Sequence, residues 1–180
     1  MPNWCNAYVV ISGKKKELRN FCKYFLYDCD NDKVMDGKTI LMKHYFARSF
    51  MWDRWDSFCG EHFKQKDKAN DVIEIQFSLD FAWSCWSCIF EGYPNKKDCV
   101  TLDSVLKKLD IETLEITTEE GGCGFEEKIT YDKENGLDYN CENMPTYKCE
   151  CGNEQMIASD YPVDETTCYE CGKDGRFVKK

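Results

Sequence analysis

The segment DVIEIQFSLDFAW, residues 71–83, has the strictest periodicity in the chain. Apolar side chains take every second position, and mainly polar ones lie between them: Ile73, Ile75, Phe77, Leu79, Phe81 and Trp83 alternate with Glu74, Gln76, Ser78, Asp80 and Ala82. Successive side chains of a β-strand point to opposite faces, so this alternation predicts one long strand. We expect one face of the strand to be buried and the other to be polar and acidic.

The rest of the N-terminal region gives a mixture of helix and strand signals. The patterns predict strands at 7–12, 111–120 and 125–131, amphipathic helices at 14–28 and 101–109, and a loop at 84–98. Thr101 or a neighbour is expected to cap the second helix, and the glycine-rich segment 121–124 to form a turn. This order of elements predicts an α+β fold with helices on one face of an antiparallel or mixed sheet.

Residues 28–70 are interpreted as an insertion after the first helix, with a short strand near 39–42 and a helical turn near 49–59. Its aromatic side chains are expected to pack onto the domain, and an exposed binding patch is the alternative: Tyr45, Phe46, Phe50, Trp52, Trp55 and Phe58. Both histidines of the chain, His44 and His62, also lie here. We interpret them as surface or packing residues rather than general bases.

Four cysteines near the C-terminus form two close pairs, and each pair is followed at once by a glycine: Cys149, Cys151, Cys168 and Cys171. Zinc takes four thiolates in a tetrahedron, which two facing turns can supply. The second pair has the usual C-x2-C spacing, but the first is one residue short, which leaves Cys141 as a substitute ligand. The sequence therefore predicts a structural zinc ribbon at 147–180, joined by a linker at 137–146 to a domain covering 1–136.

The cysteine pairs have other interpretations. A Cys149–Cys151 disulfide would close a small strained ring, and a Cys168–Cys171 redox pair lacks the helix N-terminus that favours a thiolate. Buried core thiols would need more apolar surface than this polar segment offers. Thirteen cysteines without a secretory signal or a membrane-length apolar run indicate the cytoplasm, where cysteines remain reduced.

The net charge of −9 argues against a large nucleic-acid footprint, which needs clustered lysine and arginine. Two basic stretches, Lys14–Lys16 and 63–68, are interpreted as solvated surface. The Cys85–Cys88 pair has C-x-x-C spacing, but it follows a strand rather than opening a helix. The GGCG segment lacks the lysine and the following helix of a phosphate-binding loop. We expect no catalysis.

The N-terminal segment MPNWCNAYVVISG, through Asn3, Trp4, Cys5 and Gly13, resembles the YubB-type ferredoxin-like domain family of bacteriophage and plasmid proteins. FAWS at 81–84 is similar to the family's aromatic segment after the long strand, and residues 119–136 to its closing hairpin. The chain departs from the pattern where Cys85 and Trp86 replace two prolines, and WDRWD at 52–56 has altered spacing. The resemblance implies a ferredoxin-like fold over residues 1–136 and a mobile-element origin. It implies no catalytic residues.

From the residues themselves, Trp4 and Cys5 are expected to fill the end of the core. The predicted function is that of a non-catalytic accessory protein of a phage or other mobile element. Its acidic surface would bind a basic protein, such as a host factor or a defence component. The alternatives are nucleic-acid binding through the zinc ribbon and the sheet, and thiol–disulfide exchange by Cys85 and Cys88. Salt dependence separates the first alternative, because nucleic-acid binding weakens steeply as salt rises.

Overall fold

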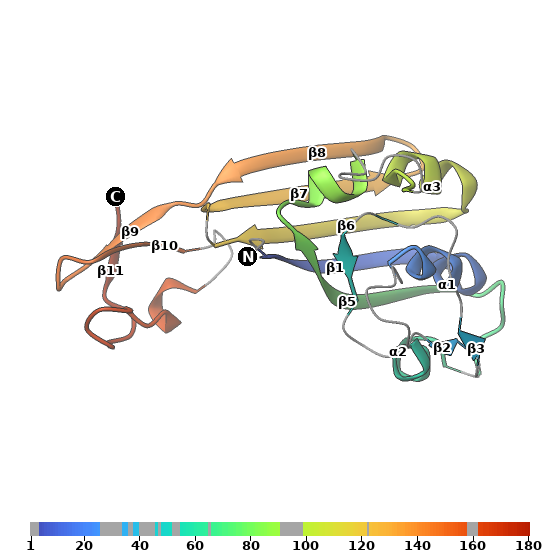
Figure 1. Ribbon diagram of the computed structural model, residues 1–180, viewed down its shortest axis with the longest axis horizontal. Helices are drawn as coiled ribbons and strands as arrows, with labels where there is room; N and C mark the ends of the chain where they lie inside the picture. The colour runs from blue at the N-terminus through green and yellow to red at the C-terminus, as the bar shows by residue number, and fades with distance from the viewer. Residues whose placement is uncertain are drawn as a thin grey trace.

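The protein is built on a six-stranded antiparallel sheet with helices on one face and a small cysteine-containing sheet at one end (Figure 1). The computed structural model describes residues 4–25, 34–35, 38–39, 46, 48–51, 55–64, 66–90, 99–121, 123–157 and 162–180. The large sheet has the order β4 (Ser49–Phe50), β5 (Val72–Ala82), β1 (Trp4–Lys14), β6 (Ile111–Glu120), β7 (Phe125–Asp132) and β8 (Gly136–Asn143).

The remaining elements are short. The helical ones are α1 (Lys15–Lys23), α2 (Trp55–His62), the π-helical turn η1 (Trp86–Phe90), α3 (Leu102–Lys108) and the 3-10 turn η2 (Val163–Glu165). Two short strands, β2 (Val34–Met35) and β3 (Lys38–Thr39), form a separate hairpin. A second sheet has the order β10 (Glu154–Met156), β9 (Thr146–Cys149) and β11 (Phe177–Lys179). The fold is therefore a mixture of α and β elements with antiparallel sheets, as the sequence predicted in outline.

The centre of the large sheet is the pairing of β1 with β5, which runs from Trp4 opposite Ala82 to Lys14 opposite Val72. Ile75, Phe77, Leu79 and Phe81 of β5 are buried against the helices, which confirms the predicted strand. Trp83 departs from the pattern: its side chain is 52% exposed and its φ is 94°. The alternation ends there because the chain turns sharply into η1.

Two predicted helices cover this face. In α1 the apolar stripe buries Leu18, Phe21 and Cys22, but the helix ends at Lys23, whereas the pattern predicted an end near residue 28. Before α3, the side-chain oxygen of Thr101 accepts a hydrogen bond from the Ser104 N–H, which confirms Thr101 as the N-cap.

Part of the predicted insertion is visible. Phe46, Trp55 and Phe58 are buried in the main core, so the packing interpretation is confirmed for them. The predicted helical turn at 49–59 is wrong in its first part, because Ser49–Phe50 pair with β5 and the helix begins at Trp55. His62 packs its ring against Phe58, at 4.5 Å between centroids, whereas His44, Tyr45, Trp52 and residues 40–42 lie outside the described residues.

The segment after β5, predicted as a loop, starts with the turn η1. The buried carboxylate of Glu127 on β7 accepts hydrogen bonds from the backbone N–H groups of Cys85 (2.7 Å) and Trp86 (3.1 Å). The same carboxylate accepts from Thr118 Oγ1 at 3.2 Å and from the Tyr139 hydroxyl at 2.9 Å. A negative charge at the start of a helical turn satisfies N–H groups that have no partner within the turn.

Of the two N-terminal residues expected to fill the end of the core, Cys5 is buried and Trp4 is not. Cys5 is fully buried, and its Sγ lies 3.8 Å from Glu127 Oε2. Trp4 does not fill the end of the core, because its side chain is 41% exposed. Trp4 falls on the opposite face of β1 from Cys5, since successive residues alternate.

The expected linker at 137–146 is mostly a strand. β8 pairs with β7 from Gly136 opposite Asp132 to Asn143 opposite Phe125, and only Met144 and Pro145 separate β8 from β9. The division of the chain into two domains stays a prediction, but an irregular connection between them is wrong.

The two sheets meet where β6 turns into β7. Gly124 has a φ of 72°, and a Cβ atom at this position would overlap Sδ and Cε of Met156. The Gly124 carbonyl also accepts a hydrogen bond from the Met144 N–H at 2.8 Å. The left-handed conformation therefore favours glycine here, and any larger residue would also require the end of the Met156 side chain to move.

We predict that Glu127→Ala lowers the free energy of unfolding by about 3 kcal/mol or more, because several buried donors each lose their acceptor at about 1–3 kcal/mol. Urea unfolding followed by tryptophan fluorescence measures this change. Glu142→Ala is the control, since that carboxylate is exposed on the neighbouring strand, and it should change stability by less than about 0.5 kcal/mol. Equal effects of the two substitutions would show that the Glu127 contacts do not stabilise the fold.

Candidate metal centre and acidic sheet face

The four predicted cysteines come together in the small sheet and its turns, which we call the cysteine unit (residues 146–157 and 162–180). Cys149 ends β9, and Cys151 follows in the turn towards β10. Cys168 and Cys171 lie in a second turn before β11, which pairs with β9. The pairing of three strands thus places two turns opposite each other.

Each cysteine pair is closed by a tight turn that needs its glycine. The Gly152 N–H donates to the Cys149 carbonyl at 2.9 Å, and the Gly172 N–H donates to the Cys168 carbonyl at 2.8 Å. Both glycines have positive φ, 97° for Gly152 and 65° for Gly172. Glycine adopts these values at little steric cost, which explains why it follows each pair.

The four sulfur atoms all lie within 4.8 Å of one another. Cys149 Sγ is 3.8 Å from Cys171 Sγ, and Cys151 Sγ is 3.7 Å from Cys168 Sγ. A disulfide needs about 2.05 Å between sulfurs, so these cysteines are not bonded to each other. Four thiols this close could hold one metal ion.

Backbone N–H groups also point towards this cluster. A hydrogen bond from the Cys171 backbone is the main cause that lowers the pKa of Cys168 to about 6. Cys149 and Cys168 are buried, whereas Cys151 is exposed. Cys141, the suggested substitute ligand, is exposed on β8 opposite Glu127 and lies outside the cluster. The shortened first pair is therefore compatible with the geometry as it stands.

The cysteines of the large sheet have a different environment. Burial raises the pKa of Cys88 to about 12 and raises the pKa of Cys85 well above its ordinary value, with the Glu127 carboxylate adding to the effect at Cys85. Cys5 is similar, with a pKa raised by burial to about 12. Thiols of this kind stay protonated near neutral pH, and the thiolate is the nucleophilic form.

The face of the large sheet opposite the helices is acidic. The strand register places Asp80, Asn6, Glu119, Glu126 and Glu142 opposite one another across β5, β1, β6, β7 and β8. We call these residues the acidic row. Neighbouring strands are about 4.8 Å apart, so the row spans roughly 19 Å. Like charges on directly opposed residues destabilise a sheet, and the row therefore carries an electrostatic cost.

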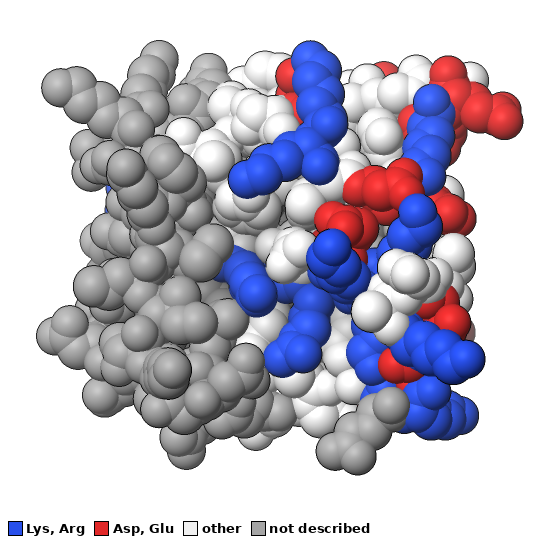
Figure 2. Space-filling view, turned by 90° about the vertical axis from the view of Figure 1, so that its right-hand side faces the viewer, with Lys and Arg blue, Asp and Glu red and all other residues white. Residues whose placement is uncertain are grey.

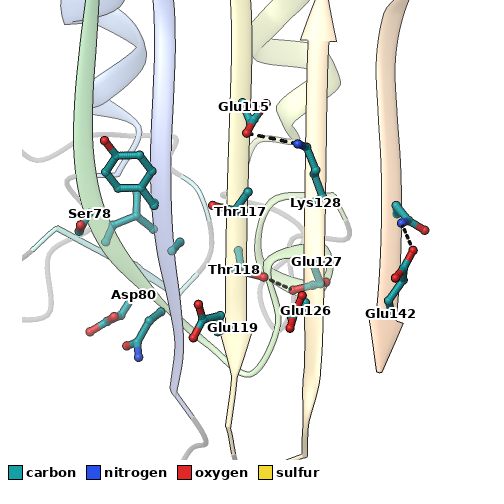
Figure 3. A pocket seen from close by; sticks show the side chains of 15 residues that line it. Ser78, Asp80, Glu115, Thr117, Thr118, Glu119, Glu126, Glu127, Lys128 and Glu142 are labelled. Atoms are coloured by element: carbon teal, nitrogen blue, oxygen red, sulfur yellow. Dashed lines mark hydrogen bonds and ion pairs between the residues drawn. The ribbon is translucent and has the colours of Figure 1, made fainter. Parts of the chain in front are cut away.

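The acidic row lies in a shallow hollow of about 780 Å³ on this open face. In Figure 3 the carboxylates of Asp80, Glu119 and Glu126 lie at a similar height across their strands, with Glu115 and Lys128 further along. Among the described residues that line the hollow, Lys128 is the one basic residue, and its Nζ is paired with Glu115 at 3.3 Å. Tyr8 also lines the hollow and is 46% exposed.

The end of the molecule away from the cysteine unit carries lysine and arginine side chains interspersed with carboxylates (Figure 2). The N–H groups of Lys15 and Lys16 donate to the carbonyls of Asp71 and Ala69, both at 2.9 Å, and Lys15 Nζ donates to the carbonyls of Lys64 and Asp67. The expectation of purely solvated surface is thus wrong for Lys15, which closes the loop before β5.

Lys14 is also bound within the protein at this end. Lys14 and Lys133 both pair with Asp110, at 2.7 and 2.6 Å. The hydrogen bonds from Lys133 and then Lys14 lower the pKa of Asp110 to about 2.

Three comparisons, with protein-family models, with curated proteins and with solved structures, found no match to the chain. None of the helices in the described ranges combines the length and apolar character needed to cross a bilayer.

Sequence reasoning found the cysteine cluster and Asp80 but missed the rest of the acidic row and Glu127. A signal for Glu127 existed, because Phe125, Glu127, Ile129 and Tyr131 alternate with polar residues, so a carboxylate stood at an apolar position. The row itself had no local signal, since its members come from five separate strands. Glu74, singled out with Asp80, is opposite Ser12, remote from the row along β5.

We predict that Cys168→Ser removes stoichiometric metal from the purified protein, whereas Cys141→Ser retains it. The reason is that Cys168 belongs to the cluster of four cysteines and Cys141 does not. Elemental analysis after gel filtration measures the metal content. If Cys141→Ser alone lost the metal, the ligand set would have to include that residue. Metal-free wild-type protein would contradict the assignment altogether.

Proposed function

We propose that this protein is a non-catalytic binding protein whose acidic sheet face holds a basic segment of a partner protein. The acidic row is the observation that carries this proposal. Four of its five residues are carboxylates, and they lie on the face of the sheet opposite the described helices. A basic segment would relieve the repulsion within the row, so the cost of the arrangement in the free protein becomes a gain on binding.

The shape of the site supports a polypeptide partner. The hollow is broad and shallow and is lined by residues of five strands, which suits an extended chain lying across the sheet. An extended chain rises about 3.3 Å per residue, so about six residues would cover the row of roughly 19 Å. Tyr8 offers an exposed ring on which a lysine or arginine cation can rest.

A non-catalytic role is supported by the chemistry of the buried groups that could otherwise take part in catalysis. Thiol exchange by Cys85 and Cys88 would need a thiolate, and burial opposes ionisation of both. The Glu127 carboxylate is fully engaged as a hydrogen-bond acceptor for backbone and side-chain donors. These groups serve the packing of η1 against the sheet.

We propose that the cysteine unit is a zinc ribbon and that its metal is structural. With zinc–sulfur bonds of about 2.3 Å, the sulfurs of a tetrahedral site are separated by about 3.8 Å. The two shortest sulfur separations, 3.8 and 3.7 Å, agree with this edge length. All four positions are taken by cysteine, as in closed structural sites, and the metal would supply folding energy to a unit with little apolar core.

The finer fold assignment is also a proposal. The elements β1, α1, β4, β5, α3 and β6 follow the β-α-β-β-α-β order of ferredoxin-like domains, with β2, β3 and α2 inserted and the β7–β8 hairpin added. This order supports the ferredoxin-like assignment, and the N-terminal resemblance supports an accessory protein of a phage or other mobile element. It would act in the cytoplasm of a bacterial host on a basic host factor or defence component.

Nucleic-acid binding is the second candidate, and one observation favours it. Lys16, Lys64, Lys66 and Lys68 are exposed, and the loop that carries the last three is hydrogen-bonded to the start of α1 through the Lys16 N–H and Lys15 Nζ. Along β1, this end is eight residues from Asn6 in the acidic row, or about 27 Å. The Debye length is about 8 Å at physiological salt, so the two surfaces act independently.

We predict that a fluorescein-labelled oligolysine octapeptide binds the full-length protein and that Asp80→Asn/Glu119→Gln/Glu126→Gln weakens binding about tenfold or more. Exposed ion pairs are worth about 0.2–1 kcal/mol each, and three pairs of about 0.5 kcal/mol give that factor. Fluorescence anisotropy gives the dissociation constants. The matched control, Glu74→Gln/Asp103→Asn/Glu134→Gln, removes the same charge elsewhere and should weaken binding less than about threefold.

Equal weakening by the two triple variants would mean that net charge, not the acidic row, attracts the peptide. A labelled 20-nucleotide DNA probe is titrated in parallel. Binding of DNA without binding of oligolysine would replace this proposal by the second candidate.

A further inference from the structure

A second hollow, of about 410 Å³, lies between the end of the large sheet and the cysteine unit. Its walls come from the β6–β7 turn, the β8–β9 connection and the cysteine unit: Glu119, Gly121, Met144, Gln155, Met156, Ile157, Glu165, Thr166, Thr167 and Tyr169. Glu119 also lines the first hollow and belongs to the acidic row. The two hollows are therefore adjacent at Glu119.

The wall formed by Met156 is fixed in place by backbone contacts. Its Sδ and Cε press against Gly124, and the next residue, Ile157, donates its N–H to the Pro145 carbonyl at 3.2 Å. The Met144 N–H donates to the Gly124 carbonyl at 2.8 Å. The Met156 side chain is still 41% exposed, so it offers a polarizable apolar surface to a ligand.

The cysteine unit also contributes an exposed aromatic ring and a carboxylate to the lining of the hollow. Tyr169 is 86% exposed, and its backbone N–H donates to Gln155 Oε1 at 3.3 Å, which holds that stretch against β10. Glu165 is exposed in η2 and also lines the hollow. The hollow thus combines two carboxylates, Glu119 and Glu165, with a ring and two methionine side chains.

This combination fits a guanidinium group better than an ammonium group. Guanidinium is planar, weakly hydrated and able to donate two parallel hydrogen bonds to a carboxylate while its face stacks on an aromatic ring. Lysine presents a compact, strongly hydrated charge that gains less from a ring and from thioether surfaces. A neutral aromatic ligand would bring no positive charge to the two carboxylates.

We infer that the second hollow is an arginine subsite of the interface formed by the acidic row, with Tyr169 and Glu165 as the residues that select arginine over lysine. This inference rests on the proposed function, because it takes the partner to be a basic protein segment. It adds a sequence requirement: the partner carries an arginine next to the residues that occupy the acidic row. The cysteine unit thereby supplies specificity, and the sheet supplies general attraction.

The test compares two labelled octapeptides of equal charge, oligoarginine and oligolysine, in anisotropy titrations of the full-length protein. Wild-type protein is expected to bind the arginine peptide about fivefold more tightly or better. Tyr169→Ala and Glu165→Gln are each expected to reduce this ratio to about twofold or less while leaving the lysine peptide within about twofold of wild type. Tyr169→Phe keeps the ring and should keep the preference.

The control is Val178→Ala, which truncates another exposed side chain of the cysteine unit that does not line the hollow. It should leave both dissociation constants unchanged. Unaltered metal content and near-ultraviolet circular dichroism establish that the variants are folded. A preference for arginine that survives in Tyr169→Ala would overturn the subsite, whereas failure of both peptides to bind wild-type protein would overturn the proposed function itself.

Discussion

One buried carboxylate holds together segments that lie far apart in the chain. Glu127 on β7 accepts hydrogen bonds from the start of η1, from Thr118 on β6 and from Tyr139 on β8, and Cys5 of β1 lies against it. A buried charge is tolerated only where donors replace its water, and here backbone and hydroxyl groups do so. The path of the chain after β5 follows from this arrangement, because η1 must begin where its first N–H groups reach Glu127. Trp83 takes an unusual backbone conformation at that turn.

A structural feature could be predicted from the sequence where the residues that determine it lie close together along the chain. The cysteine cluster was predictable because each pair is organised by its own tight turn, within a few residues of Gly152 or Gly172. The central strand β5 was predictable because one of its faces is buried along most of its length. β8 was mistaken for a linker because it is an edge strand with little burial, so it has no need to alternate apolar and polar residues. The acidic row depends on strand register, which no single stretch of sequence records.

Acidic and basic side chains are concentrated in different parts of this protein, which the net charge of −9 does not reveal. Carboxylates gather across the open sheet face near the cysteine unit, while lysines gather at the start of α1 and in the loop before β5. Some of those lysines have structural work: Lys15 closes a loop, and Lys14 with Lys133 holds Asp110. The contacts that charged groups make within the fold are therefore a better guide to binding partners than the net charge is.

The contact between Gly124 and Met156 bears on where the chain can be divided. Two residues separate β8 from β9, and Met156 reaches back to rest on the β6–β7 turn, so the small sheet is seated on the large one. A fragment that ends before Met144 would expose the backbone around Gly124 and remove one wall from the space beside Glu119. Likewise, the cysteine unit transplanted onto another protein would carry its metal ligands but not the glycine that accommodates Met156. The two sheets are thus best expressed, mutated and crystallised as one piece.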